Sequence, residues 1–202
     1  MVQKSLRLLT EQLSPRDTVS IVTYAGAERV VLEPTSAAEK STILAAISDF
    51  SSGGSTAMGA GIDLAYKMAA VKHRKGVNNR VIVLSDGDAN VGRTSHEEIL
   101  GQIAGYVKEG ITLSTVGFGM GNYKDTTMEQ LANKGNGNNY YVDSLDEAKR
   151  IFVDKISATL EVVAKDVKLQ VDFNSDKVAR YRLIGYENRD IGPKVKQYIL
   201  FG

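Results

Sequence analysis

One short segment constrains the fold of this chain more than any other: residues 81–84 (VIVL), four apolar residues without a polar interruption. A half-exposed strand alternates apolar and polar residues, whereas a strand covered on both faces in a parallel sheet is apolar throughout. The polar turn at residues 85–92 (SDGDANVG) follows at once. We therefore expect a buried parallel strand with a polar loop at its carboxyl end.

Helical and extended patterns alternate along most of the chain. An amphipathic helix over residues 2–13 is expected to end before Pro15. Residues 18–24 and 29–32 are rich in β-branched side chains and are close enough for an antiparallel hairpin. The remaining expected elements are helices at about 37–50, 58–69, 97–108, 128–133 and 145–163, and strands at 81–84, 111–116 and 139–142. This order predicts an α/β fold with a mostly parallel sheet flanked by helices.

The pattern changes after Lys165. Residues 167–173 alternate apolar and polar side chains like a half-exposed strand, and residues 195–201 are a candidate final strand. We therefore expect one large domain at residues 1–165 and a short β-containing C-terminal extension at residues 166–202.

Composition excludes several classes of function. The chain has 25 basic and 24 acidic residues, so no bulk charge favours nucleic acid as a partner. The absence of cysteine excludes disulfides, zinc–thiolate sites and cysteine nucleophiles. No apolar run approaches the roughly 18 residues of a membrane-spanning helix, and no signal-peptide pattern is present.

Two loops are expected where ligands bind in open α/β sheets, beyond the carboxyl ends of the strands. Residues 53–56 (GGST) precede a helix, so Thr56 offers a hydroxyl beside free helix amides, although it could equally be a plain helix cap. Asp86 and Asp88 follow the buried strand and offer the oxygen ligands that Mg²⁺ prefers. The alternative for this second loop is a polar turn in which Asp88 or Asn90 bonds the local backbone.

The order of these motifs resembles a known family. The segments IVTYAG, GGST, VIVLSDGDANVG and ITLSTVGFG, spread over about residues 2–165, look like a bacterial von Willebrand factor type A domain. The later segments VAKDVKLQVDFN and YRLIGYENR resemble the C-terminal extension of one bacterial subgroup. The resemblance implies a Rossmann-like fold and a non-enzymatic, protein-binding adhesion module, and suggests an extracytoplasmic or cell-envelope location.

The resemblance also implies a metal-ion-dependent adhesion site. In this family the site is built from an Asp-x-Ser-x-Ser motif, a threonine and the aspartate of a (Thr/Ser)-Asp-Gly turn; Thr56 and Asp86 match the second and third. The first motif lies in the family on a strand ahead of the helix that starts here near Val2, so we expect a truncated form of the domain. We expect Mg²⁺ or another divalent cation in the complete protein, and weak or no binding by this chain.

The absent first strand would lie at the centre of the family's sheet, between residues 18–24 and 81–84. Unpaired backbone groups at their edges need partners. We expect one of three solutions: residues 195–201 fill the place, a second copy of the chain exchanges a strand into it, or the two flanking strands pair directly.

Other functions remain as alternatives. Asp86 could be the nucleophile of a Mg²⁺-dependent phosphatase or phosphotransferase, or the chain could be an assembly domain that binds its partner without metal. The only histidines, His73 and His96, are expected to be solvated surface residues rather than catalytic bases. The GFGMG segment at residues 117–121 lacks the spacing of a dinucleotide-binding loop and is expected to be a flexible loop.

Overall fold

The computed structural model describes residues 1–24, 27–49, 58–74, 76–86, 96–119 and 126–155, with short pieces at 169–170, 174, 176–177 and 198–199. The chain divides into two compact units, Met1–Glu161 and Val162–Gly202. Within these described stretches, no helix is long and apolar enough to cross a membrane.

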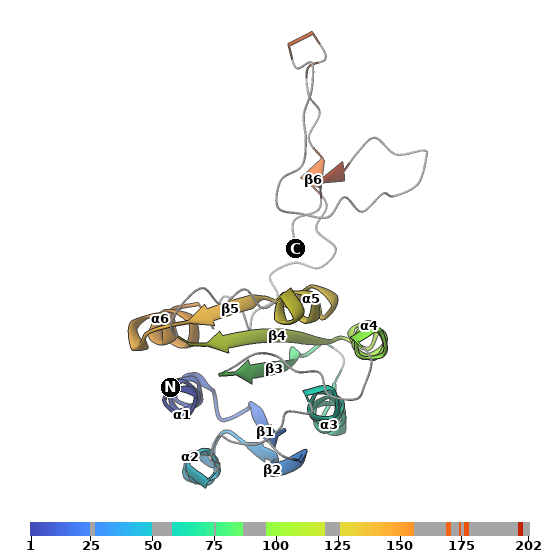
Figure 1. Ribbon diagram of the computed structural model, residues 1–202. Helices are drawn as coiled ribbons and strands as arrows, with labels where there is room; N and C mark the ends of the chain where they lie inside the picture. The colour runs from blue at the N-terminus through green and yellow to red at the C-terminus, as the bar shows by residue number, and fades with distance from the viewer. Residues whose placement is uncertain are drawn as a thin grey trace. The chain divides into compact units, whose positions relative to one another are not determined.

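Helices and strands alternate along the first unit (Figure 1). In chain order the elements are α1 (Val2–Gln12), β1 (Thr18–Thr23), β2 (Arg29–Ser36), α2 (Lys40–Asp49), α3 (Met58–Val71), β3 (Asn79–Ser85), α4 (His96–Lys108), β4 (Ile111–Phe118), α5 (Thr126–Lys134), β5 (Asn139–Val142) and α6 (Leu145–Lys149). A π-helical turn at Arg150–Asp154 continues α6. The expected α/β fold is confirmed.

The buried apolar run lies in β3, an outer strand of a three-stranded parallel sheet with the order β3-β4-β5. Val81 and Val83 belong to the apolar cluster on one face of the sheet, whereas Ile82 and Leu84 pack into the cluster on the other face. Each face therefore needs apolar side chains from this strand, which explains why the run has no polar alternation.

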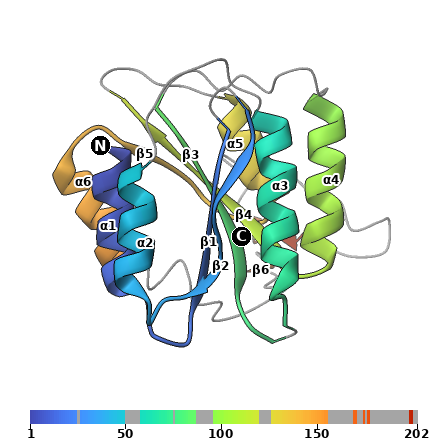
Figure 2. The same cartoon turned by 90° about the horizontal axis from the view of Figure 1, so that it is seen from below.

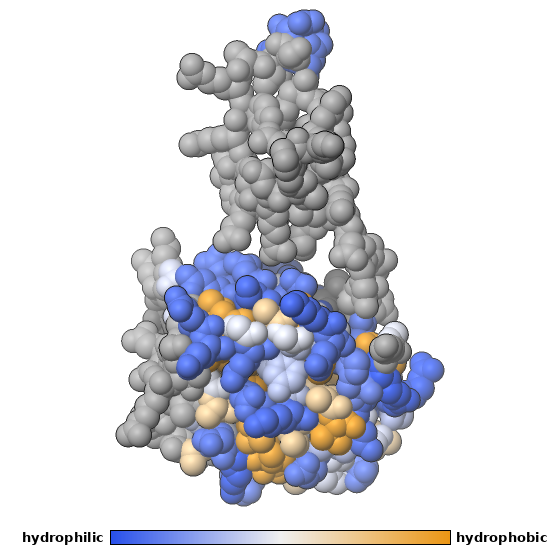
Figure 3. All heavy atoms as spheres, turned by 90° about the vertical axis from the view of Figure 1, so that its right-hand side faces the viewer, coloured by the Kyte–Doolittle hydropathy of each residue, from blue (hydrophilic) through white to orange (hydrophobic). Residues whose placement is uncertain are grey.

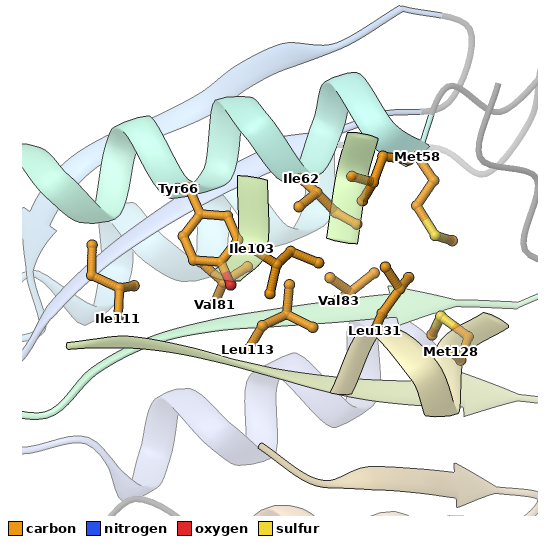
Figure 4. Close-up of a cluster of buried hydrophobic side chains, with 11 residues drawn as sticks. Met58, Ile62, Tyr66, Val81, Val83, Ile103, Ile111, Leu113, Met128 and Leu131 are labelled. Atoms are coloured by element: carbon orange, nitrogen blue, oxygen red, sulfur yellow. The ribbon is translucent and has the colours of Figure 1, made fainter. Parts of the chain in front are cut away.

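Two groups of helices cover the sheet. Figure 2 shows α1, α2 and α6 on one side of the strands and α3 and α4 on the other. The cluster under α3, α4 and α5 contains the side chains drawn in Figure 4. On the opposite face Phe152, from the π-helical turn, is fully buried with Val116 and Phe118 of β4.

The hairpin of β1 and β2 forms its own antiparallel sheet. Among the residues that the structure describes, β1 and β3 share no backbone ladder, so the expectation that the flanking strands pair directly is wrong. Helix α3 contacts both strands. The two sheets are therefore held to the same helix through side chains instead of through backbone hydrogen bonds.

The C-terminal strand also has a different partner from the one expected. In the second unit β7 (Tyr198–Ile199) pairs antiparallel with β6 (Leu169–Gln170). The described part of residues 195–201 thus bonds a neighbouring segment of the extension, and the expectation that it fills the place beside β1 and β3 is wrong. Strand exchange with a second copy stays a prediction.

Two expected boundaries are also corrected. Gly117 is a buried residue inside β4, so the strand runs two residues farther than its β-branched segment suggested, and the expected flexible loop does not include it. The helix expected from residue 145 changes to π-helical bonding, in which the Lys155 amide donates to the Arg150 carbonyl, and residues 156–163 lie outside the described part.

One buried hydroxyl in the core has no hydrogen-bond partner among the described residues. Tyr66 is fully buried and stacks on Tyr106, with ring centroids 4.3 Å apart, yet its hydroxyl is unpaired. Burial, with a smaller effect of Tyr106, raises the pKa of Tyr66. Its phenol therefore stays neutral and still lacks a partner.

Tyr66→Phe is expected to raise the free energy of unfolding by up to about 1 kcal/mol, because the variant removes an unsatisfied polar group and keeps the ring. Urea unfolding measures the change. Tyr66→Leu is the matched control: it also removes the hydroxyl but loses the stacked ring, and it should destabilise the chain. A loss of more than about 1 kcal/mol in Tyr66→Phe would show that the hydroxyl has a stabilising partner.

Candidate functional site at the carboxyl edge of the sheet

The carboxyl ends of the three parallel strands lie at the same end of the sheet (Figure 1). Ser85 is the buried last residue of β3, and Asp86 follows it with an exposed side chain. At the same edge Gly119 follows β4 and the exposed Asp143 follows β5. The buried strand therefore places the Asp86 carboxylate in solvent, where a ligand can reach it.

Tyr24 connects the two sheets at this edge. It directly follows β1, and its hydroxyl donates a hydrogen bond of 2.5 Å to the backbone carbonyl of Leu84 in β3. Burial raises the pKa of Tyr24 to about 12, a hydrogen bond with the Ser85 side chain opposes the increase, and the negative charge of Asp86 adds to it. Tyr24, Ser85 and Asp86 thus form one electrostatically linked group.

A glycine in α3 makes room for Tyr24. A β-carbon placed on Gly61 would lie 2.5 Å from the Tyr24 Cβ atom, closer than real Cβ contacts allow. Because the contact is with the root of the side chain, Tyr24 could not avoid it by rotating its ring. Gly61 therefore lets α3 approach the end of β1, and Tyr24 fixes β1, α3 and β3 together.

Sequence reasoning missed Tyr24 and Gly61. The contact between Tyr24 and Leu84 spans 60 residues of sequence, so no local pattern reveals it. The available signal was a glycine inside the expected helix, three residues after its start, since glycine disfavours a helix and its presence there favours a close packing contact.

The described residues supply only part of a donor set for a metal. Asp86 is the one predicted ligand that the structure places, whereas Thr56, Asp88 and Asn90 lie outside the described residues. Elsewhere in the described ranges, no three His, Cys, Asp or Glu side chains are grouped to hold a metal ion. Mg²⁺ takes about six oxygen ligands, so Asp86 needs further donors to form a specific site.

His73, one of the two histidines, lies near the amino end of β3, at the opposite end of the sheet from Asp86. His73 follows α3 in a loop and is half-buried, and its Nε2 atom lies 3.8 Å from the position of a β-carbon on Gly110, just before β4. His73 is thus a partly exposed loop residue that keeps some contact with solvent. Because β3 separates it from Asp86 by its whole length, about 20 Å, His73 is not a base for chemistry at Asp86.

Tyr24→Phe is expected to lower the free energy of unfolding by about 1–2 kcal/mol, because the Leu84 carbonyl loses its donor. The folded-state pKa of Tyr24, about 12, lies above the ordinary value of 10.0, so the neutral phenol contributes stability that is complete below pH 10 and is lost as the pH rises through 12. Urea unfolding between pH 8 and pH 12 should therefore show the wild type approaching the variant. An equal difference at every pH would contradict this role for Tyr24.

Two family models match the chain. The von Willebrand factor type A domain matches residues 1–154, and the model described as "Uncharacterized protein YfbK, C-terminal" matches residues 158–194. The YfbK protein of Escherichia coli K12 is 42% identical over 191 residues, which cover 95% of this chain and 33% of that protein. The chain thus spans about a third of the length of this relative.

Solved structures share the fold. A von Willebrand factor type A protein from Catenulispora acidiphila superimposes with a TM-score of 0.64 at 14% identity, over 79% of this chain and 37% of that one. The proximal thread matrix protein 1 of the mussel byssus, solved with a zinc-occupied metal-ion-dependent adhesion site, gives 0.59 at 22% identity, over 78% and 39%. Domains of this type typically mediate protein interactions. With the family model covering residues 1–154, the chain belongs to the von Willebrand factor type A family.

Proposed function

We propose that the chain is part of a non-enzymatic protein-binding module that contacts its partner at the carboxyl edge of the sheet. The observation that carries the proposal is the exposed Asp86 carboxylate, which directly follows buried β3 and lies in one electrostatic group with Tyr24 and Ser85. Buried strands fix the backbone on which Asp86 is mounted, so a partner meets a preformed surface.

A divalent cation is part of this proposal for the complete protein. Asp86 and Thr56 would be two of its oxygen ligands, and Mg²⁺ is the cation that suits them. The bound cation would attract a carboxylate of the partner, a contact stronger than an exposed ion pair. Support comes from the family and from the zinc-occupied site of the mussel protein.

Asp86→Asn tests the proposal, because it removes one negative charge from the ligand set and keeps the shape of the side chain. Titration with Mn²⁺, followed by its electron paramagnetic resonance signal, measures binding by the full-length protein and by this chain. We expect Asp86→Asn to lower the affinity of the full-length protein at least about tenfold, and to abolish the weak binding by this chain.

Asp143→Asn is the matched control, because Asp143 is an exposed carboxylate that follows a parallel strand at the same edge. The control should bind Mn²⁺ like the wild type. Equal binding by Asp86→Asn and the wild type would contradict the metal proposal. Hydrolysis of p-nitrophenyl phosphate that requires Mg²⁺ and Asp86 would contradict the non-enzymatic function.

We also propose that a second copy can supply a strand beside β1 and β3. In the described residues β1 pairs only with β2, and β3 pairs only with β4, so each has an edge that could accept a strand. Size-exclusion chromatography with light scattering should then show a dimer that dissociates on dilution. A monomer at all concentrations would contradict strand exchange.

We also propose that the boundary between the domain and its extension lies near Lys165.

A further inference from the structure

Exposed apolar and basic side chains lie together from the last residue of α3 to the loop before β3. Val71 and Val77 are 62% and 54% exposed, more than any other large hydrophobic side chain of the described residues. Between them lie Lys72 and Arg74, both exposed, and Lys75. The segment at residues 71–77 (VKHRKGV) thus has a valine at each end of a run of basic residues. We call it the valine–lysine loop.

Positive charge is concentrated in this part of a nearly neutral chain. Of its 25 basic and 24 acidic residues, five basic and no acidic ones lie between Leu64 and Ser85. One of the five, Lys67, is paired with Asp63 at 2.7 Å, whereas Lys72 and Arg74 appear in no ion pair of the described residues. The rest of the chain is therefore net acidic, and the loop is a local positive site.

Hydrogen bonds join the described residues on the two sides of Lys75. The Asn79 side-chain amide donates to the backbone carbonyls of Val77, at 2.9 Å, and Arg74, at 3.3 Å. The Val77 amide donates to the Arg74 carbonyl at 3.4 Å, and Gly76 adopts a φ of 81°, which favours glycine. These bonds fix the part of the loop around Val77, which therefore loses little conformational entropy on binding.

The neighbouring surface carries both hydrophobic and hydrophilic side chains. Figure 3 shows the side of the molecule on which α3 and α4 lie, with hydrophobic side chains in separate patches among hydrophilic ones. At the end of α4 the exposed Lys108 and Glu109 lie near the loop, because His73 packs over Gly110, and their charges offset each other. The net positive charge at this end of α3 and α4 therefore comes from the loop.

We propose that the valine–lysine loop docks on the surface of an anionic lipid membrane. Exposed apolar side chains next to lysine and arginine are suited to a membrane interface: the valines enter the boundary of the hydrocarbon region and the cations meet the lipid phosphates. An acidic peptide would pair with the cations alone, whereas a lipid interface also takes up the exposed valines. The positive charge that would attract the lipid is confined to the loop, so docking does not require a net charge on the whole chain.

Such docking would leave the opposite edge of the sheet free. The loop joins the amino end of β3, and Asp86 follows its carboxyl end, seven residues away. Seven extended residues span about 20 Å, so Asp86 would face away from the membrane. The membrane contact does not depend on the proposed function of Asp86, and Asp86→Asn should leave it unchanged.

Flotation with lipid vesicles tests the inference. The chain should bind vesicles with about 30% phosphatidylglycerol, bind phosphatidylcholine vesicles far less, and lose binding as salt increases. Lys72→Gln with Arg74→Gln should reduce the affinity about tenfold or more. Val71→Ser with Val77→Ser should reduce it several-fold at unchanged charge.

Matched controls remove the same groups elsewhere. Lys134→Gln with Lys149→Gln removes two exposed charges, and Leu145→Ser removes an apolar side chain that is 43% exposed. Both controls should bind like the wild type. Equal binding to neutral and anionic vesicles, equal losses in the controls, or no vesicle binding would overturn the inference. Binding of poly-glutamate without binding of anionic vesicles would also overturn it, in favour of an acidic protein partner.

Discussion

Gly137→Ala is expected to lower the free energy of unfolding by about 3 kcal/mol or more, the largest effect among the substitutions considered. Gly137 lies in the turn between α5 and β5, and a β-carbon there would overlap the backbone carbonyl of Leu113 in β4. The same turn is bonded to β4, because the Leu113 amide donates to the Gly135 carbonyl at 2.9 Å. Neither the strand backbone nor the turn can move without losing these bonds.

Gly105→Ala is the matched control for Gly137→Ala. Gly105 is an exposed residue of α4 with no atom within 4 Å of the position of its β-carbon. Alanine should stabilise this helix by about 0.5–1 kcal/mol. Urea unfolding of both variants measures the difference. A Gly137→Ala variant within about 1 kcal/mol of the wild type would contradict the close packing of the turn on β4.

Gly61→Ala should have the second-largest effect, a loss of about 2 kcal/mol. Alanine is the better helix former, but the new β-carbon would lie 2.5 Å from the Tyr24 Cβ atom. Relief of this overlap requires Tyr24 to move, and such a movement weakens its hydrogen bond to the Leu84 carbonyl. The same substitution at Gly101, which also has open space around it in α4, should stabilise the chain.

A double-mutant cycle separates the two causes of this loss. If Gly61→Ala acts partly through the Tyr24 hydroxyl, its cost should be smaller in the Tyr24→Phe background, where that hydrogen bond is already absent. Thermal or urea unfolding of the four proteins gives the coupling. Stabilisation by Gly61→Ala, as at Gly101, would show that α3 does not pack on the end of β1.

Local patterns predicted the parallel sheet because burial on both faces leaves a direct trace in the sequence. The apolar run in β3 could be interpreted without knowledge of its neighbours. The hairpin of β1 with β2 was also predictable from nearby residues, but what lies beside the other edge of β1 was not, and direct pairing with β3 does not occur in the described residues. The partner of residues 198–199 could not be predicted either. These residues pair with β6, which lies at least 28 residues earlier in the chain.

The candidate site was predictable in part for the same reason. Asp86 follows a strand that the sequence identifies, so its place at the carboxyl edge could be expected. Tyr24 reaches the site across 60 residues of sequence, and only the folded chain shows that its phenol is bonded to Leu84 and senses the charge of Asp86. The role of Thr56 stays a prediction.

We propose that a divalent cation binds at the carboxyl edge around Asp86. Nuclear magnetic resonance of this chain with substoichiometric Mn²⁺ tests it most directly, because paramagnetic broadening reports even weak binding and locates it. Broadening should be strongest at the amides of Ser85 and Asp86, extend to Tyr24, and disappear in Asp86→Asn. Broadening centred on Asp143 or Asp146, with Ser85 and Asp86 unaffected, would contradict the claim.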